Sequence, residues 1–281
     1  MPEGPEIRRA ADRLARVLVD APLTRVWFRF PRLQRQVPTL EGERIRSVRA
    51  WGKALLMEFD GGRTLYSHNQ LYGRWYVQRA GVRPQTNRDL RLVLETPTHA
   101  ALLYSASEID LLAPGEWQAH PFLGKLGPDV FDPATTPAFL RRRLRDRAFA
   151  RRTLGGLLMD QHFLAGLGNY LRSEILFIAG VHPDARACDL DDAALARLTR
   201  EIRAIARRAY LTRGETAPKA WVRARTAQGL PRRACRHYVF EREEEPCPRC
   251  AMAIQRRDVA GRRLYLCTRC QPLPGSRKEA P

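Results

Sequence analysis

The segment CPRCAMAIQRRDVAGRRLYLCTRC, residues 247–270, decides the fold of the C-terminal part of the chain. It holds two Cys-x2-Cys pairs separated by sixteen residues, a spacing typical of tetrathiolate zinc sites. Four sulfur ligands leave no open coordination position, so the sequence predicts one structural zinc ion and places any catalysis elsewhere. The residues between the pairs predict a β-hairpin that turns near Ala260 and Gly261. The predicted ligands are Cys247, Cys250, Cys267 and Cys270.

The composition of the whole chain indicates a polyanionic partner. Its 281 residues, 44% of them hydrophobic, are enough for a buried core and suggest two domains. The 49 Lys and Arg against 30 Asp and Glu give a formal charge of +19, typical of proteins that bind nucleic acid or anionic membranes. No apolar run approaches the roughly 18 residues of a membrane span, and the acidic start does not fit a signal peptide. We therefore expect a soluble, cytoplasmic protein that binds nucleic acid. Disulfides are rare in that compartment, so a zinc site is favoured over two disulfides for the four clustered cysteines.

Upstream of the zinc segment the pattern changes from strands to helices. Short runs rich in Val, Trp, Phe and Tyr occupy residues 26–107 and predict a β-sandwich or barrel after a leading helix. Helical spacing then continues to about residue 225, although 212–236 is polar and is interpreted as a linker or mobile loop. Strands followed by helices indicate an α+β multidomain fold. We expect a β-sandwich domain in 1–132, a helical domain in 133–236, the zinc hairpin in 237–271 and a disordered tail in 272–281.

The opening residues MPEGPE combine a helix start with a candidate nucleophile. Pro5 suits a first helical turn, and Glu3 and Glu6 complement the helix dipole. If Met1 is removed, Pro2 becomes a secondary amine that can attack an electrophilic sugar carbon and form a Schiff base. Glu3 could then guide proton transfers, and Glu6, one turn on, would face the same pocket. With Met1 retained, the Pro2 nitrogen is an inert amide. The residues alone therefore leave two classes open, an enzyme acting on nucleic acid and a binding module without chemistry.

Six motifs in register resemble the bacterial endonuclease VIII branch of the formamidopyrimidine-DNA glycosylase family, whose members are DNA glycosylases with AP-lyase activity. The resemblance spans residues 1 to about 271. It implies an N-terminal β-sandwich with a leading helix, a helical domain with a helix–two-turn–helix motif, and a C-terminal zinc β-hairpin. The motifs are MPEGPEIRRAADRLA (1–15), WGKALL (51–56), LYSHNQLYG (65–73), HPFLGKLGPDV (120–130), DQHFLAGLGNYLRSEIL (160–176) and the four-cysteine hairpin.

The resemblance implies catalytic roles for the matching residues. Pro2 would be the nucleophile, Glu3 the proton donor, and Lys53, on the GKALL strand, the residue that assists β-elimination. Lys53 is one of four lysines in the chain, and a desolvated lysine, unlike arginine, can lose its proton. Arg262 would serve δ-elimination. Because Arg263 follows where the family pattern has proline, that role stays open between the two arginines.

The resemblance also implies DNA contacts. Gln70, Leu71 and Tyr72 match the loop that enters the base stack and fills the space left by an everted base. Asn169 lies at a helix N-terminus after tight glycine turns, where backbone N–H groups and its amide can meet phosphates. Lys125 stands where the family has a phosphate-contacting arginine, which keeps the charge but loses the bidentate fork.

We expect a monomeric enzyme that excises oxidised pyrimidines from duplex DNA through a Schiff base on Pro2, followed by β,δ-elimination. Purine-lesion excision is the first alternative, although the MPEGPEIR opening and the Gln70-Leu71-Tyr72 trio favour the endonuclease VIII branch. A catalytically silent zinc DNA-binding protein is the second. The preferred lesion and the roles of Cys188 and Cys235 stay open.

Overall fold

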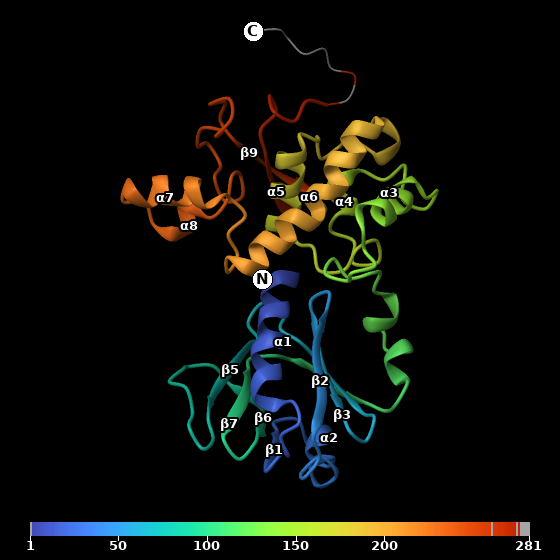
Figure 1. The fold of residues 1–281 in the computed structure, drawn as a ribbon, viewed down its shortest axis with the longest axis vertical. Coiled ribbons are helices and arrows are strands. Elements are labelled where there is room, and N and C mark those ends of the chain that lie inside the picture. Colours follow the sequence, from blue (N-terminus) through green and yellow to red (C-terminus); the bar gives the residue numbers. More distant parts are fainter. Residues whose placement is uncertain (1, 260, 274, 276–281) are drawn as a thin grey trace. The chain divides into compact units, whose positions relative to one another are not determined.

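The chain folds into two compact units, Met1–Lys125 (unit 1) and Leu126–Pro281 (unit 2), in a computed structural model that describes residues 2–259, 261–273 and 275 (Figure 1). The α+β architecture predicted from the sequence is confirmed: unit 1 is built from strands with a leading helix, and unit 2 from helices and the C-terminal hairpin. Within the described ranges, no helix is both long enough and apolar enough to cross a membrane.

Unit 1 is a β-sandwich. Its strands are β1 (Arg25–Phe28), β2 (Ile45–Trp51), β3 (Ala54–Phe59), β4 (Thr64–His68), β5 (Arg74–Arg79), β6 (Leu90–Glu95), β7 (His99–Tyr104) and β8 (Glu108–Leu112). They form two antiparallel four-stranded sheets, ordered β1-β6-β7-β5 and β2-β3-β4-β8. Leu94 from the first sheet and Leu55 from the second share one buried core, because alternate side chains of each strand point inward. Short helical turns are α2 (Pro31–Gln34), η1 (Val37–Thr39), η2 (Glu116–Gln118) and η3 (Leu123–Lys125).

The leading helix α1 (Gly4–Leu18) contributes to the same core. Leu14 and Leu18 are completely buried, and each such burial stabilises the fold by about 2 kcal/mol. The helix contacts β2, β3, β5 and β7, so it packs against both sheets. Its N-terminal end is consequently held in a fixed place on the sandwich. The buried apolar stripe of α1 is Ile7, Ala11, Leu14 and Leu18.

Unit 2 is a helical bundle onto which the zinc hairpin packs. Its main elements are α3 (Pro137–Arg145), α4 (Leu154–Leu157), α5 (Asn169–Ala179), η4 (Ala187–Asp189), α6 (Asp192–Leu211), β9 (Gln255–Val259) and β10 (Arg262–Leu266). Helix α5 is buried on nearly all sides and forms the centre of the bundle. Leu264 and Leu266 of β10 lie in the same core as α5. The predicted hairpin is present, with β9 and β10 paired antiparallel around Gly261.

The segment interpreted as a linker or mobile loop contains two short helices, α7 (Lys219–Ala227) and α8 (Arg232–Cys235). Helix α7 has no buried residue, so it carries no apolar stripe from which helical periodicity could be recognised. The predicted tail begins at residue 272, and its residues 274 and 276–281 lie outside the described ranges.

Candidate functional site

The N-terminal end of α1 holds its two glutamates in different ways. Glu3 caps the helix and is only 4% exposed. The carboxylate of Glu6 accepts a hydrogen bond from the Glu3 backbone N–H (3.0 Å), and its other oxygen accepts one from Arg9 (3.1 Å). Glu6 therefore fixes the backbone of residue 3 and, with it, the adjoining Pro2. This contact gives Glu6 a positioning role, and the interpretation that its carboxylate faces the same pocket as Pro2 and Glu3 stays a prediction.

Lys53 lies in a two-residue turn between β2 and β3, and not within a strand as the motif suggested. The first turn residue, Gly52, has a φ of +61°, a conformation that glycine adopts without strain. The turn presents a half-buried Lys53 at the end of the hairpin. Burial lowers the pKa of His68 and the charge of Lys53 lowers it further, whereas Glu108 acts in the opposite direction. Lys53 and a neutral His68 are therefore electrostatic neighbours.

The loop between β4 and β5 exposes two large apolar side chains. Leu71 is 60% exposed and Tyr72 is 68% exposed, in contrast to the buried middle of the preceding strand β4. The loop closes tightly at Gly73, where a Cβ atom would lie 2.6 Å from the carbonyl oxygen of Asn69. Glycine is therefore required there for steric reasons. The structure thus places Leu71 and Tyr72 at the tip of a constrained turn.

The base of this loop is held by Gln70. Its backbone N–H donates to Nδ1 of His68 (3.2 Å), and its side-chain oxygen accepts a hydrogen bond from Ser107 (2.6 Å). The side-chain amide of Gln70 also donates to Glu108. These contacts come from β4 and from the start of β8, so Gln70 is anchored while its two neighbours are exposed.

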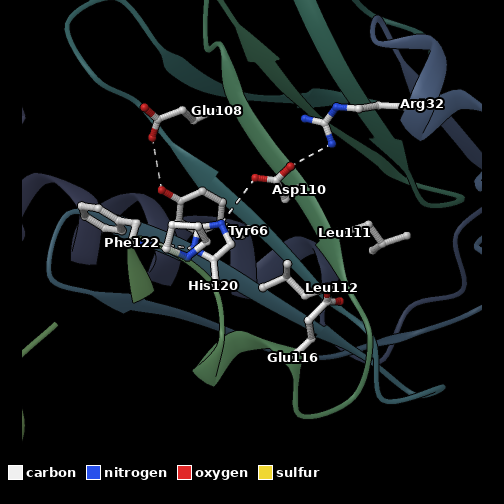
Figure 2. A pocket seen from close by; sticks show the side chains of 10 residues that line it. Arg32, Tyr66, Glu108, Asp110, Leu111, Leu112, Glu116, His120 and Phe122 are labelled. Carbon is white, nitrogen blue, oxygen red and sulfur yellow. Dashed lines mark hydrogen bonds and ion pairs between the residues drawn. The ribbon is translucent and has the colours of Figure 1, made fainter. Parts of the chain in front are cut away.

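Beside this loop the outer face of β4 and β8 carries a hollow of about 690 Å³ (Figure 2). Two of its carboxylates, those of Asp110 and Glu108, have side-chain partners that also line the hollow. Asp110 lies 2.8 Å from Arg32 and 3.4 Å from His120, and Glu108 accepts a 3.3 Å hydrogen bond from the Tyr66 hydroxyl. Burial and the neighbouring Glu108 raise the pKa of Tyr66, which keeps the hydroxyl a donor. Glu108 therefore links the two features: it accepts hydrogen bonds from Tyr66 in the hollow and from Gln70 in the loop.

In unit 2, a glycine-rich turn leads into the N-terminus of α5. Gln161 organises this turn: its amide nitrogen donates to the carbonyl of Leu167 (2.9 Å), and its oxygen accepts from the backbone N–H of Gly166 (3.0 Å). Gly166 has a φ of +102°, which a residue with a side chain rarely adopts. Asn169 is the first residue of α5. The turn thus leaves a helix N-terminus with its amide groups directed out of the helix, a geometry suited to an anion.

The hairpin arginines differ in their partners. Arg256 and Arg257 of β9 form ion pairs with Glu243 (3.0 Å) and Asp184 (2.7 Å). Arg262 and Arg263 are both exposed at the start of β10. Lys125, at the end of η3, is exposed on unit 1.

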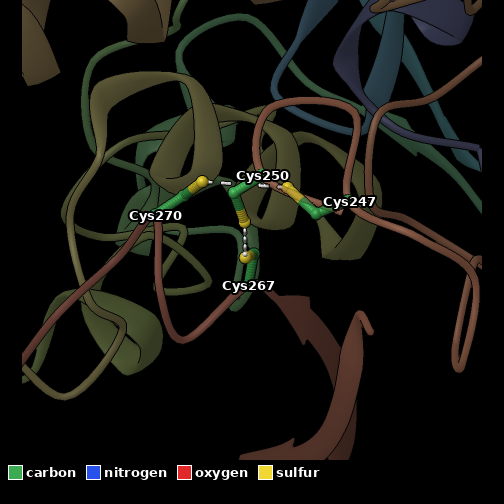
Figure 3. Close-up of side chains that lie close together, drawn as sticks. All are labelled: Cys247, Cys250, Cys267 and Cys270. Carbon is green, nitrogen blue, oxygen red and sulfur yellow. Dashed lines mark hydrogen bonds between the residues drawn. The ribbon is translucent and has the colours of Figure 1, made fainter. Parts of the chain in front are cut away.

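The four hairpin cysteines gather as the spacing predicts (Figure 3). All four sulfur atoms lie within 4.8 Å of one another, with 3.7 Å between Cys247 and Cys270 and 3.4 Å between Cys250 and Cys267. A tetrahedral zinc ion with Zn–S bonds of about 2.3 Å requires sulfur separations of about 3.8 Å. The donor set therefore fits zinc, and the four thiolates would fill its coordination sphere. This confirms the predicted structural zinc site.

Removal of zinc by a strong chelator is expected to unfold the hairpin and weaken DNA binding. The hairpin core around Ile254 and Tyr265 is small, so metal ligation supplies much of its stability. Zinc content, circular dichroism and DNA affinity, measured along one chelator titration, should change together. Full DNA affinity in zinc-free protein would contradict this prediction.

The sequence reasoning missed a buried carboxylate on α5. Glu174 is completely buried and accepts hydrogen bonds from the Thr216 hydroxyl (2.6 Å) and from the backbone N–H groups of Tyr238 (2.8 Å), Val239 (2.8 Å) and Phe240 (3.0 Å). Burial raises the pKa of Glu174, whereas these four donors oppose that change by stabilising the carboxylate. Glu174 thereby joins the two ends of the segment that carries α7 and α8.

A neutral histidine completes this network. Burial and the neighbouring Arg236 lower the pKa of His237 to about 3, so the imidazole stays uncharged. Arg236 can only donate, and it lies 3.2 Å from Nε2 of His237, so Nδ1 carries the proton and donates to the Thr216 oxygen (2.9 Å). Glu174 lies within the family motif at residues 160–176, but nothing in that motif indicates its partners at Thr216 and residues 238–240.

A β-sandwich with a proline and a glutamate at the start of its leading helix, together with an anion-binding type of helix N-terminus and a zinc hairpin, is an arrangement characteristic of DNA base-excision enzymes. Three family profiles match the chain in succession. They are the formamidopyrimidine-DNA glycosylase N-terminal domain (residues 1–106), the H2TH domain of the same enzyme (126–219), and a zinc finger found in FPG and IleRS (244–273).

Two curated relatives carry the same name. Endonuclease 8 of Escherichia coli and that of Pectobacterium atrosepticum are each 46% identical to this chain, over 271 and 278 residues, covering 96% of it and 100% of the relative. Among solved structures, the MutM (Fpg) protein of Thermus thermophilus is 29% identical, with a TM-score of 0.77 over 96% of this chain and 98% of that one. The Lactococcus lactis Fpg, solved with DNA containing N7-benzyl-Fapy-dG, shares the fold at 22% identity and a TM-score of 0.78, covering 97% and 100%.

The chain belongs to the formamidopyrimidine-DNA glycosylase and endonuclease VIII family. It is accordingly a DNA glycosylase with AP-lyase activity that acts in base excision repair.

Proposed function

We propose that the enzyme excises oxidised pyrimidines from duplex DNA through an iminium (Schiff-base) intermediate on the amine of Pro2, which is freed by removal of Met1. The observation that carries the proposal is the start of α1, where Pro2 precedes a buried Glu3 whose backbone is fixed by Glu6. A nucleophile and an acid held on a rigid helix end meet the requirement for precise positioning in covalent catalysis.

The proposed reaction proceeds in two stages. The Pro2 nitrogen attacks C1′ of the damaged nucleotide, the C1′–N bond to the base breaks, and the base leaves with the proton that the attacking amine gives up. Glu3 protonates O4′, the C1′–O4′ bond breaks, and the opened sugar is left as a C1′=N⁺ iminium on Pro2. The resulting iminium acidifies the C2′ proton, and its removal, assisted by Lys53, expels the 3′ phosphate. A second elimination, assisted by Arg262, expels the 5′ phosphate and leaves a one-nucleotide gap.

Residues of both unit 1 and unit 2 would contact DNA. Leu71 and Tyr72 would fill the space left by the flipped nucleotide, with Gln70 anchoring the loop, because an apolar wedge offsets lost base stacking. Lys125 and the Asn169 end of α5 would bind phosphates. Endonuclease 8 relatives at 46% identity support the pyrimidine branch over purine-lesion excision, the second candidate.

Borohydride trapping on duplexes with defined lesions tests the chemistry. The enzyme is expected to form a covalent adduct with thymine glycol or dihydrouracil duplexes in better yield than with 8-oxoguanine duplexes. Mass spectrometry should locate the adduct on Pro2. Trapping in better yield on the 8-oxoguanine duplex would favour the purine candidate, and no adduct on any lesion would overturn the proposed intermediate on Pro2.

Replacement of both Leu71 and Tyr72 by alanine is expected to lower excision by at least about tenfold, because the wedge no longer repays part of the unstacking. Cleavage of a preformed abasic site should fall less, since no base remains to be extruded. Replacement of Val82, another exposed apolar residue of unit 1, by alanine serves as the control. Equal losses on both substrates would argue against a role in base flipping.

We also propose that the protein acts as a monomer in the cytoplasm on chromosomal DNA. The sandwich, the helical domain and the zinc hairpin are proposed as its functional parts, with boundaries near residues 132 and 236. Sedimentation of the free enzyme tests the monomer.

A further inference from the structure

Arg172 is a completely buried arginine in the middle of unit 2. It is among the largest side chains that are completely buried in the described part of the chain. It lies on α5, one turn after Asn169. Placing a guanidinium in a protein interior is costly unless its donors are satisfied. Apolar packing alone therefore does not account for Arg172, and its hydrogen-bond partners must be considered.

The guanidinium connects three elements. Its Nη1 donates to the carbonyl of Gly155 in α4 (2.9 Å). Its Nη2 lies near the carbonyls of Arg263 (3.0 Å) and Arg262 (3.4 Å) at the start of β10, and near the side-chain oxygen of Asn169 (3.2 Å). Gly155 itself is tightly packed, because a Cβ atom there would lie 3.0 Å from Pro183.

The contact with Asn169 decides how that amide is oriented. A guanidinium offers only donors, so the atom of Asn169 that faces it must be the oxygen. The NH2 group then remains as the part of the amide available to another molecule, and it can only donate. A donor at a helix N-terminus suits a phosphate, whereas the opposite orientation would present an oxygen to an anion and repel it.

The contacts with β10 fix the backbone from which two arginines extend. The carbonyls of Arg262 and Arg263 are held against α5, and the backbone N–H of Tyr265 donates to the Ser173 hydroxyl (3.2 Å). The hairpin is thereby attached to the same turn of α5 that carries Asn169. Both side chains of Arg262 and Arg263 remain exposed.

We propose that Arg172 is a positioning residue that turns the Asn169 amide toward the DNA phosphate and holds the start of β10 for δ-elimination. The inference rests on the proposed function, because it gives Asn169 and the hairpin arginine the roles named there. A lysine cannot replace Arg172, since a single ammonium lacks the planar fork that reaches α4, α5 and β10 together.

A double-mutant cycle tests the Asn169 half of the proposal. Arg172→Lys, Asn169→Ala and the double variant are titrated with a duplex carrying an uncleavable tetrahydrofuran abasic analogue at one salt concentration. Arg172→Lys is expected to weaken binding about tenfold in the parent and less than about twofold in the Asn169→Ala background. Arg200→Lys, an exposed arginine of α6, is the matched control and should bind as the parent does.

The products test the hairpin half. On a preformed abasic duplex, Arg172→Lys should shift the products from β,δ- toward β-elimination at least about threefold, while the control Arg200→Lys leaves the ratio unchanged. A purely structural defect would lower both products equally. Zinc content and melting temperature, measured on every variant, identify any variant that does not fold.

A measurement on the parent protein keeps the proposal falsifiable if Arg172→Lys does not fold. The side-chain NH2 resonances of Asn169, assigned by their absence in Asn169→Ala, are expected to shift when the tetrahydrofuran duplex binds. Unshifted resonances, equal losses from Arg172→Lys in both backgrounds, or an unchanged product ratio would each overturn the proposal. If Asn169→Ala binds like the parent, the assigned DNA contact fails as well, which separates that failure from a failure of Arg172 alone.

Discussion

Replacing Lys53 with arginine is expected to lower base excision about a hundredfold or more while leaving DNA binding almost unchanged. The substitution keeps the positive charge, so it preserves any attraction to phosphate. Arginine stays protonated at working pH and cannot exchange a proton as lysine can. Lys53 is half-buried in the tight turn between β2 and β3, and its charge helps to lower the pKa of His68. Cleavage of a preformed abasic site should also fall, because Lys53 assists β-elimination. The loss should be smaller than for excision, because Lys53 also helps settle the flipped nucleotide before the base leaves, a step that an abasic site does not need.

Three measurements on one variant make this prediction decisive: excision of a lesion, strand cleavage at an abasic site, and binding to an uncleavable analogue. Lys219→Arg, at an exposed lysine on α7, controls for the exchange of side chain and should match the parent in all three. Equal excision by Lys53→Arg and the parent would remove Lys53 from the proton-transfer steps and leave Pro2 and Glu3 to carry the mechanism.

Replacing Glu174 with alanine is expected to lower the free energy of unfolding of unit 2 by about 3–5 kcal/mol. Four donors, three of them backbone N–H groups, would lose their acceptor in a place that water does not reach. Glu174→Gln should lower the free energy of unfolding by less than Glu174→Ala does. It should still lower it, because the glutamine NH2 group would face one pair of these donors instead of accepting from them.

Urea denaturation of zinc-loaded protein measures this effect. Glu243→Ala is the control, since Glu243 forms an exposed ion pair with Arg256 and such pairs are worth at most about 1 kcal/mol. Hydrogen exchange should show that Glu174→Ala opens the segment carrying α7 and α8 first. Unfolding free energies that are the same for Glu174→Ala and Glu243→Ala would contradict the network described here.

Features that depend on residues close in sequence were predicted well. The four hairpin cysteines gather as their spacing indicates, because each pair is a local turn and the hairpin between them has a short reach. The strands of unit 1 follow from alternation of apolar residues, which records burial residue by residue. The chemistry proposed for Pro2 and Glu3 likewise depends on adjacency at the start of one helix.

Other features depend on partners that are distant in sequence, and these only the tertiary structure decided. Glu174 meets donors 42 to 66 residues away, and Arg172 meets carbonyls of β10 about 90 residues away. The local sequence pattern around a charged residue on a buried helix does not reveal its partner, because that partner is brought near only when the chain folds. The sequence by itself therefore determined the zinc ligands, the strands and the family motifs. The tertiary structure decided which charges are buried and which backbone groups they hold, because satisfying a buried charge requires donors and acceptors from several elements at once.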